Sequence, residues 1–396
     1  MSDILNYNPG MQYRRFGKTN VDVSCITLGG MRYVHGWEDP REDIPNDMVD
    51  HAAKCITRAM DCGINLIETA YGYKKSEKCH GMVLNDVLKL PRESYCLMTK
   101  GRGELKNEEL PMRQMVEKQL KDLQTDYFDF YAFHGINTPE LCQKACAPGG
   151  PVEELLKMKE EGIIGHVGFS THASPETIVQ AIDTDMFDFV NLHNYYFYQQ
   201  TQIAVDRAAE KDMGVFIISP NDKGGQLFNP SDTVREAALP RTAIQWNSRF
   251  CLKSPAVHTL TFGMTEMEHF DEMAGIFTGS IDWNSEDQKS LDILDQCVTR
   301  DTLSQIDGYD IGWLDSDINI PEVLRFWKMW KCYDMHSFVS YRYNMLEGKG
   351  DWSPGHFATE DAIETINENL IPKGLPLKKM LREIHHEFFI DKSIKK

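Results

Sequence analysis

The stretch INLIETAYGYKKSEKCHGMVLNDVLKLPRESYCLMTKG, residues 64–101, contains one complete structural repeat of the chain. An apolar strand, NLIETA, comes first, a segment with helical periodicity spans residues 76–88, and a second apolar strand, YCLMTKG, follows. Two strands joined by a helix in this way are typical of a β-α-β unit, in which the strands run parallel. The stretch therefore predicts two parallel strands with a helix packed on them.

The same alternation continues on both sides of this stretch. A short hairpin that turns at residues 17–20 comes before the first strand. The predicted strands are 25–28, 65–70, 95–101, 127–135, 166–171, 187–194, 214–220 and 257–263. The predicted helices are 46–62, 76–88, 110–123, 152–161, 175–182, 199–212, 241–250 and 266–277. Eight such repeats predict an α/β fold, a (β/α)8 TIM barrel with an N-terminal β-hairpin.

A doubly wound open sheet is the alternative fold for alternating strands and helices. When such a sheet binds a dinucleotide, a G-x-G-x-x-G turn normally follows its first strand. Here the first strand ends in LGGMRY, residues 28–33, which lacks that turn. The closed barrel is therefore favoured.

Residues 281–396 do not continue the alternation. Their periodicity is mostly helical, for example in PEVLRFWKMWKCY and in TEDAIETINENL. We therefore expect two parts. Residues 1–280 would form the barrel, and residues 281–396 would form an appended helical extension packed on it.

The composition narrows the possible partners and compartments. A formal net charge of −18 over 396 residues disfavours binding to nucleic acid or to an anionic membrane surface. The sequence MSDILNYNPGMQYRR at the N-terminus has no apolar segment of a signal peptide. No apolar run approaches the roughly 18 residues of a membrane-spanning helix. The ten cysteines are dispersed, as in a reduced intracellular chain. These features predict a cytoplasmic protein.

Four polar side chains fall where consecutive strands of the predicted barrel end. Glu68 and Lys100 stand at the ends of the two strands quoted above, and Tyr73 lies in the loop after the first. His134 ends the next strand. Active sites of such barrels form at the C-terminal ends of the strands. Each residue alone could be a structural group, but their common level in the barrel predicts one shared site.

The chemistry of these groups suits proton transfer to a carbonyl oxygen. A tyrosine phenol has an ordinary pKa of ~10, which is high for an acid that works near neutral pH. A nearby ammonium group stabilises the phenolate and lowers that pKa. We therefore expect Lys100 to lower the pKa of Tyr73. Glu68 would keep Lys100 charged, and His134 would orient the carbonyl oxygen.

The segment ETAYGYKKSEKCHG, residues 68–81, resembles the motif D-T-A-x-x-Y-G-x-S-E-x-x-L-G of the aldo-keto reductases. The chain resembles that family over about residues 12–280. The resemblance implies that Tyr73 is the catalytic acid, that Lys100 in LMTKG is its lysine and that His134 in YAFHG is its histidine. Glu68 stands where the family has aspartate.

The resemblance also implies a nicotinamide nucleotide as cofactor. Ser170 and Thr171, in GFSTH, would face the carboxamide of the nicotinamide, with threonine replacing the usual asparagine. Asn191, in FVNLHN, stands where a glutamine is usual.

Further segments match the parts of the family that hold the phosphates. The loop ISPNDKGGQL is similar to the one that wraps the pyrophosphate, through Ser219, Lys223 and Gly225. Thr265 and His269, in TFGMTEMEHF, are the groups offered to the adenosine 2′-phosphate. The resemblance implies NADP(H) ahead of NAD(H).

The most similar branch of the family often carries a C-terminal ferredoxin-like region with an iron–sulfur cluster. Such a cluster needs four ligands. Beyond residue 280 the chain has only Cys297 and Cys332. We therefore expect the helical region without an iron–sulfur cluster, and no other metal.

Two functions remain open at this point. The first is an NAD(P)H-dependent oxidoreductase (EC 1.1.1.-) that reduces an aldehyde, a ketone or a sugar-derived keto group, with the proton coming from Tyr73. The second is an NAD(P)H-binding regulatory or sensor protein with little or no turnover. A pure binding protein has no use for an activated phenol, and the joint presence of Tyr73, Lys100 and His134 therefore favours the enzyme.

Loop residues at the barrel mouth would line the substrate pocket. The candidates are Tyr33, Trp37, Tyr71, His172 and Tyr195. An aromatic surface with polar tips suits a polar carbonyl compound with a face that can stack, such as a sugar derivative. The sequence leaves the oligomeric state open, a homo-oligomer included.

Overall fold

The computed structural model of the chain describes residues 4–33, 36, 39–105, 110–222, 225–306, 308–346 and 355–391. The chain divides into two compact units. The first contains Met1–Pro220 and Asn247–Asp282, and the second contains Asn221–Trp246 and Trp283–Lys396. The sequence-based boundary near residue 280, and the packing of the C-terminal region on the barrel, stay predictions.

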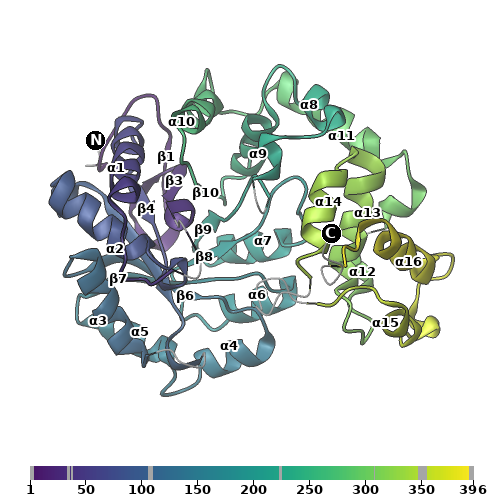
Figure 1. Cartoon of the computed structure of the whole chain (residues 1–396), viewed down its shortest axis with the longest axis horizontal. Coiled ribbons are helices and arrows are strands. Elements are labelled where there is room, and N and C mark those ends of the chain that lie inside the picture. The colour runs from purple at the N-terminus through teal and green to yellow at the C-terminus, as the bar shows by residue number, and fades with distance from the viewer. Residues whose placement is uncertain are drawn as a thin grey trace. The chain divides into compact units, whose positions relative to one another are not determined.

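The first unit contains a closed barrel of eight parallel strands among the described residues, which confirms the predicted fold (Figure 1). The order around the barrel is β10-β3-β4-β5-β6-β7-β8-β9. The strands are β3 (Ile26–Gly29), β4 (Leu66–Glu68), β5 (Cys96–Gly101), β6 (Phe128–His134), β7 (Ile164–Ser170), β8 (Phe189–Leu192), β9 (Gly214–Ile217) and β10 (Thr259–Phe262). Because all are parallel, their C-terminal ends share one rim.

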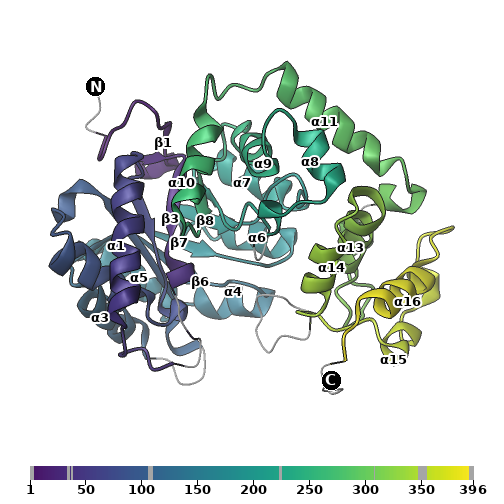
Figure 2. The same cartoon turned by 45° about the horizontal axis from the view of Figure 1, so that its top comes forward.

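Helices lie outside this ring of strands (Figure 2). Those within the first unit are α1 (Asn46–Asp61), α2 (Ser76–Gly81), α3 (Met112–Leu123), α4 (Pro139–Ala145), α5 (Pro151–Glu160), α6 (Pro175–Ile182), α7 (Gln202–Glu210) and α10 (Met267–Ala274). The helix α9 (Ala243–Leu252) begins in the second unit and ends in the first. The apolar spacing explains the packing: α1 buries Met48, Ala52 and Ile56, which lie on one face because they are four residues apart.

The predicted hairpin is present as β1 (Tyr13–Arg15) and β2 (Asp22–Ser24), which pair antiparallel. Its Phe16 is fully buried, and its ring packs edge-on against Phe130 of β6 with 5.4 Å between ring centroids. Phe16 belongs to the barrel core together with Leu66, Phe189 and Phe216. This packing fills the barrel interior with apolar side chains.

The structure differs from the sequence-based elements in three places. The helix predicted over 76–88 ends at Gly81, and a π-helix, Met82–Val87, continues it. The side chain of Asn85 donates to the Gly81 and Leu123 carbonyl oxygens, at 2.9 and 3.2 Å, within this irregular segment. The two seven-residue helices α4 and α8 (Asp232–Ala238) were not predicted, because each spans only two turns and shows little periodicity.

The second unit is helical in its described part. Its helices are α8 (Asp232–Ala238), α11 (Ser285–Val298), α12 (Gly308–Ile311), α13 (Ile320–Tyr333), α14 (His336–Tyr343), α15 (Glu360–Glu364) and α16 (Leu377–Phe388). The longest buried face is that of α13, on which Val323, Phe326 and Trp327 are buried. Within the described ranges, the helices are too short or too polar to cross a membrane.

Candidate active site

The strands deliver three of the four predicted catalytic side chains to the rim of the barrel. Glu68 is the last residue of β4, and His134 is the last residue of β6. Lys100 is the residue before the end of β5, the strand between them. Tyr73 ends the short 3-10 helix Tyr71–Tyr73, which follows β4 after a gap of two residues. The four positions therefore lie together because the chain enters three neighbouring strands in succession.

Tyr73, Lys100 and Glu68 are in direct contact. Lys100 Nζ donates a hydrogen bond to the phenol oxygen of Tyr73 at 2.9 Å, and the Tyr73 hydroxyl donates to Glu68 Oε1 at 3.3 Å. Lys100 and Glu68 also form an ion pair, and both side chains are almost fully buried. Burial removes competing water, which strengthens the electrostatic coupling between the three groups.

The pKa values of these groups correct one expectation. The pKa of Tyr73 is raised to about 12, first by burial and second by the Glu68 carboxylate, and these outweigh the lowering by Lys100. Lys100 lowers the pKa of Tyr73 as predicted, but the sequence did not show that burial and Glu68 would leave this pKa above its ordinary value. Burial lowers the pKa of Lys100, but Glu68 and Tyr73 raise it above its ordinary value. At neutral pH the phenol is protonated and the lysine is charged.

The ring of His134 lies beside that of Tyr73. The two rings are perpendicular, and their centroids are 6.0 Å apart. A Cβ atom on Gly72 would stand 3.3 Å from the His134 ring, so the turn passes close to the imidazole. Arg102 holds the end of β6 in place, because its Nε donates to the His134 carbonyl oxygen at 2.8 Å.

The residues expected to face the nicotinamide lie on the next two strands. His134, Ser170 and Asn191 are register partners on β6, β7 and β8. Among the described residues, neither polar atom of the buried Asn191 amide has a hydrogen-bond partner. The Thr171 hydroxyl donates to the Ile136 carbonyl at 2.6 Å and accepts from the Ala173 amide at 3.0 Å. Asn191 therefore has a polar group left to serve a ligand, whereas Thr171 already has two bonds within its loop.

The residues expected to hold the phosphates are less fully described. Ser219 follows β9 with a φ of 48°, a left-handed conformation that is strained for serine. Gly225, with a φ of 70°, belongs to the second unit, and Lys223 lies outside the described residues. The ring nitrogen Nδ1 of His269 accepts from the Thr265 and Glu266 amides at 3.2 Å, which caps α10.

The predicted pocket residues fall in different surroundings. Tyr33 is 3% exposed, and its ring packs edge-on against His51 and His80. Tyr195 is 1% exposed. Tyr71 and His172 are only partly buried. Trp37 lies outside the described residues. Because they are partly exposed, Tyr71 and His172 are better supported as pocket residues than the buried Tyr33 and Tyr195.

One further group near the site was not found from the sequence. His193, which follows β8, lies with its Nε2 2.8 Å from Nδ1 of His172. Both imidazoles stand just beyond the C-terminal ends of neighbouring strands. A histidine one residue after an apolar strand was the available signal, but its partner could be recognised only from the barrel geometry.

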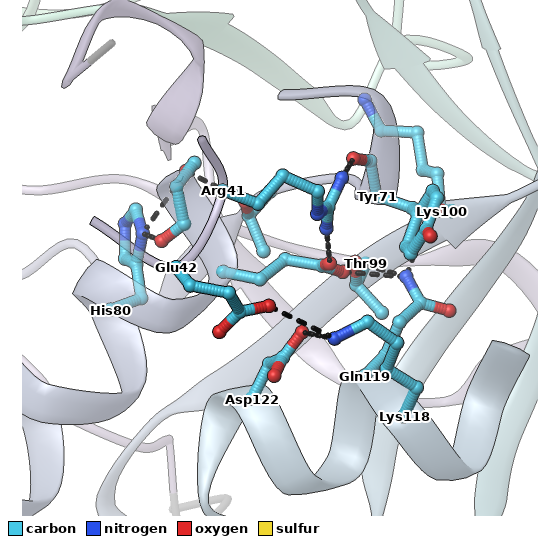
Figure 3. Close-up of polar contacts among 12 residues, drawn as sticks. Arg41, Glu42, Tyr71, His80, Thr99, Lys100, Lys118, Gln119 and Asp122 are labelled. Carbon is cyan, nitrogen blue, oxygen red and sulfur yellow. Dashed lines mark hydrogen bonds and ion pairs between the residues drawn. The ribbon is translucent and has the colours of Figure 1, made fainter. Parts of the chain in front are cut away.

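A polar cluster behind Lys100 also went unrecognised (Figure 3). The buried Glu77 of α2 accepts from Thr99 Oγ1 at 2.6 Å and from Gln119 Nε2 at 2.5 Å. Gln119 also donates to the Lys100 carbonyl at 3.1 Å, and Arg41 Nη2 lies 3.3 Å from Glu77. Glu77 stands inside the quoted motif, whereas nothing in the loop around Arg41 indicated this contact.

The sequence matches the model of the aldo/keto reductase family over residues 25–296. This span is more than half of the chain, and the protein belongs to that family. The closed parallel barrel and the contact of Tyr73 with Lys100 and Glu68 are consistent with this family.

Two plant relatives match shorter parts of the chain. A probable aldo-keto reductase 1 of Glycine max is 30% identical over 177 residues, which cover 42% of this chain and 46% of that protein. An L-galactose dehydrogenase of Arabidopsis thaliana is 27% identical over 165 residues, which cover 40% of this chain and 48% of that protein. The chain thus matches less than half the length of either relative.

Solved structures of the family share the fold. An aldo-keto reductase of Klebsiella pneumoniae in complex with NADPH superimposes with a TM-score of 0.56 at 21% identity, covering 72% of this chain and 95% of that chain. At this identity the likeness concerns the fold of the barrel.

Proposed function

We propose that this protein is an NAD(P)H-dependent oxidoreductase that reduces a carbonyl group to an alcohol. The observation that carries the proposal is the 2.9 Å hydrogen bond from Lys100 to the Tyr73 phenol, with Glu68 paired to Lys100 behind it. The arrangement presents a protonated acid whose conjugate base is stabilised by a fixed cation. A protein that only binds a nucleotide has no need of such an acid.

The residues present fit a nicotinamide cofactor. The unpartnered Asn191 amide offers both a donor and an acceptor at the level of Ser170 and His134, which is what a carboxamide group requires. When bound there, a reduced nicotinamide would supply the hydride. NADP(H) is preferred over NAD(H) in this proposal, with support from the NADPH complex of the Klebsiella pneumoniae relative.

The side chains of this chain have separate roles in the proposed reaction. Tyr73 donates its proton to the carbonyl oxygen. Lys100 stabilises the phenolate that remains, because its ammonium already donates to the phenol oxygen. Glu68 keeps Lys100 charged in a buried site, where an unpaired ammonium would be costly. His134, whose ring adjoins Tyr73, orients the carbonyl oxygen.

The proposed substrate class is a polar carbonyl compound, with sugar-derived aldehydes and ketones first. Tyr71 offers a partly buried aromatic ring, and the paired imidazoles of His172 and His193 offer polar atoms beyond β7 and β8. The name of the Arabidopsis thaliana relative, an L-galactose dehydrogenase, points in the same direction.

The experiment is a cofactor-oxidation assay with a panel of sugar aldehydes, ketoses, simple aldehydes and quinones. NADPH and NADH are first titrated by tryptophan fluorescence, where binding in the micromolar range, on the order of −8 kcal/mol, is expected for at least one. Tyr73→Phe should then lower kcat by roughly 10²–10⁴-fold while cofactor affinity is retained. Tight cofactor binding without turnover on any substrate would favour the regulatory alternative, and absence of binding would exclude both.

A further inference from the structure

The loop between β3 and α1 is tied to the segment that carries Tyr73. Three charged residues of the loop, Asp39, Arg41 and Glu42, take part. Their partners are Lys75, Glu77 and Lys78, at N–O distances of 3.0, 3.3 and 2.5 Å respectively. The contacts follow one another along both segments, so the loop runs beside the turn and the start of α2.

Arg41 makes the contact that reaches furthest toward the candidate active site (Figure 3). Its Nη1 donates to the Tyr71 carbonyl oxygen at 2.5 Å, and its guanidinium lies 3.9 Å above the centre of the Tyr71 ring. Its Nη2 pairs with Glu77. One planar group thus holds the first residue of the Tyr71–Tyr73 turn by its backbone and by its ring.

The turn contains a strained residue next to Tyr73. The Tyr73 amide donates to the Ala70 carbonyl oxygen at 2.9 Å. The next residue, Lys74, has a φ of 55°, which is strained for a residue with a side chain. A strained turn persists only where its surroundings hold it, and Arg41 contacts the first residue of this one.

Glu77, the ion-pair partner of Arg41, is hydrogen-bonded to the strand that carries Lys100. Glu77 is fully buried, and it is fixed by Thr99 of β5 and by Gln119 of α3. Gln119 in turn donates to the backbone carbonyl of Lys100 at 3.1 Å. A chain of contacts therefore runs from the turn of Tyr73, through Arg41 and Glu77, to the backbone of Lys100.

We propose that Arg41 is a positioning residue that keeps the Tyr73 phenol at hydrogen-bonding distance from Lys100. This proposal rests on the proposed function, because it assigns Arg41 a role through the acid of that reaction. The guanidinium acts by geometry: it joins the two segments whose separation sets the contact between phenol and ammonium. Arginine is suited to the task because it can stack on a ring and donate in two directions at once.

Removal of this contact should affect the chemical step more than binding. A displacement of ~1 Å at a reacting group can cost about a hundredfold in rate. We therefore expect Arg41→Met to lower kcat by roughly 10–100-fold, with the dissociation constant of the cofactor changed by less than about threefold. The kcat of Arg41→Lys should lie between those of the native protein and of Arg41→Met, because lysine keeps the charge and lacks the planar fork.

A double-mutant cycle with Tyr73→Phe tests whether Arg41 acts through Tyr73. Once the proton donor is gone, its position no longer matters, and Arg41→Met should cause no further loss of kcat in the Tyr73→Phe background. A merely structural arginine would lower the rate by the same factor in both backgrounds, which would overturn the proposal. So would an unchanged kcat for Arg41→Met in the otherwise native protein.

Two further variants keep the test decisive. Glu77→Gln preserves the shape of the anchor and removes its charge, so it should reproduce part of the Arg41→Met loss even if that variant folds poorly. Arg58→Met, which removes a surface ion pair with Asp271 at 2.7 Å, is the matched control and should leave kcat unchanged. If Tyr73→Phe alone leaves kcat intact, the proposed function fails; if only the Arg41 and Glu77 variants do so, the positioning proposal fails.

Discussion

Glu68 lies beside a residue that has no side chain. A Cβ atom on Gly29 would stand 3.4 Å from Glu68 Oε2 and 2.8 Å from Thr261 Oγ1, so a side chain there would crowd this part of the barrel. Gly29 ends β3 and is the register partner of Glu68 at the end of β4. Glutamate is one methylene longer than aspartate, and the space beside Gly29 gives a physical reason why the longer residue fits.

We expect Glu68→Asp to lower kcat by about tenfold to a hundredfold. The shorter side chain would move the carboxylate ~1 Å away from Lys100, and Gly29 has no side chain that could compensate for this shift. Steady-state kinetics with a confirmed substrate check this, with cofactor affinity as the control. A gain in kcat would mean that the site is not built around glutamate.

Glu68→Gln should move the basic limb of the pH–rate profile. Glu68 raises the pKa of Tyr73, and its neutral replacement should bring that pKa below about 12. Reduction needs the protonated phenol, so the rate falls as pH rises through this pKa, and the fall should begin at lower pH in the variant. The measurement is kcat/KM from about pH 6 to about pH 11, over which the native protein should keep its rate to higher pH than the variant. Glu176→Gln, at an exposed position of α6, should leave the limb in place.

The unpartnered amide of Asn191 predicts opposite effects on stability and on cofactor binding. A buried polar group without a partner costs about 1–3 kcal/mol. Asn191→Leu should therefore raise the free energy of unfolding of the free protein, or leave it unchanged. The same variant should reduce the thermal stabilisation by saturating NADPH, because the carboxamide loses its partner.

A matched control is available in the same barrel. The Asn65 amide is buried and bonded: its oxygen accepts from the Ser24 amide at 2.8 Å and its nitrogen donates to the Asp22 carbonyl at 3.0 Å. Asn65→Leu should destabilise the protein and leave the NADPH effect intact. Equal destabilisation by both leucine variants, measured by thermal unfolding, would speak against a ligand role for Asn191.

Features that follow a repeating pattern of apolar residues along the chain could be predicted from the sequence. The strands that carry Glu68 and Lys100 at or next to their ends are short apolar runs, and parallel strands place such ends on one rim. The family motif then supplied the roles of these residues. The fold and the neighbourhood of Tyr73 therefore followed from local pattern and topology.

Features that depend on tertiary balance could not be predicted. Arg41 lies in a polar loop without periodicity, and its contact with Glu77 exists only because the barrel brings both segments together. The raised pKa of Tyr73 reflects competition between burial, Glu68 and Lys100, which residue identities alone do not decide. Thr171 matched the cofactor motif, but its hydroxyl is already bonded within the loop.

The second unit should depend on a buried arginine. Arg325 of α13 pairs with Asp222 at 2.9 Å and with Glu322 at 2.8 Å, and all three side chains are buried. Removing one partner of a buried ionic group leaves charges poorly compensated, so Arg325→Met should cost about 3–5 kcal/mol of stability in urea unfolding. Arg382→Met, which removes exposed ion pairs, should leave the unfolding midpoint nearly unchanged.

The buried Glu77 predicts that stability falls as pH rises. Burial raises the pKa of Glu77 to about 7 from 4.5, and Asp122 adds to this, while Thr99, Gln119 and Arg41 oppose it. Between these two values the folded state holds the proton more tightly than the unfolded state. By linkage, the free energy of unfolding should decline as pH rises from 4.5 to about 7 and level off above.

Glu77→Gln isolates this effect, because an amide does not titrate. The decline across the window, on the order of 3 kcal/mol, should disappear in the variant when unfolding is measured at closely spaced pH values. Glu42→Gln is the control from the same group of contacts. Lys78 lowers the pKa of Glu42, so this carboxylate stabilises the protein above its ordinary pKa and loses that effect only at lower pH. Its replacement should leave the decline through the upper window in place, whereas a decline that survives in Glu77→Gln would show that another group titrates there.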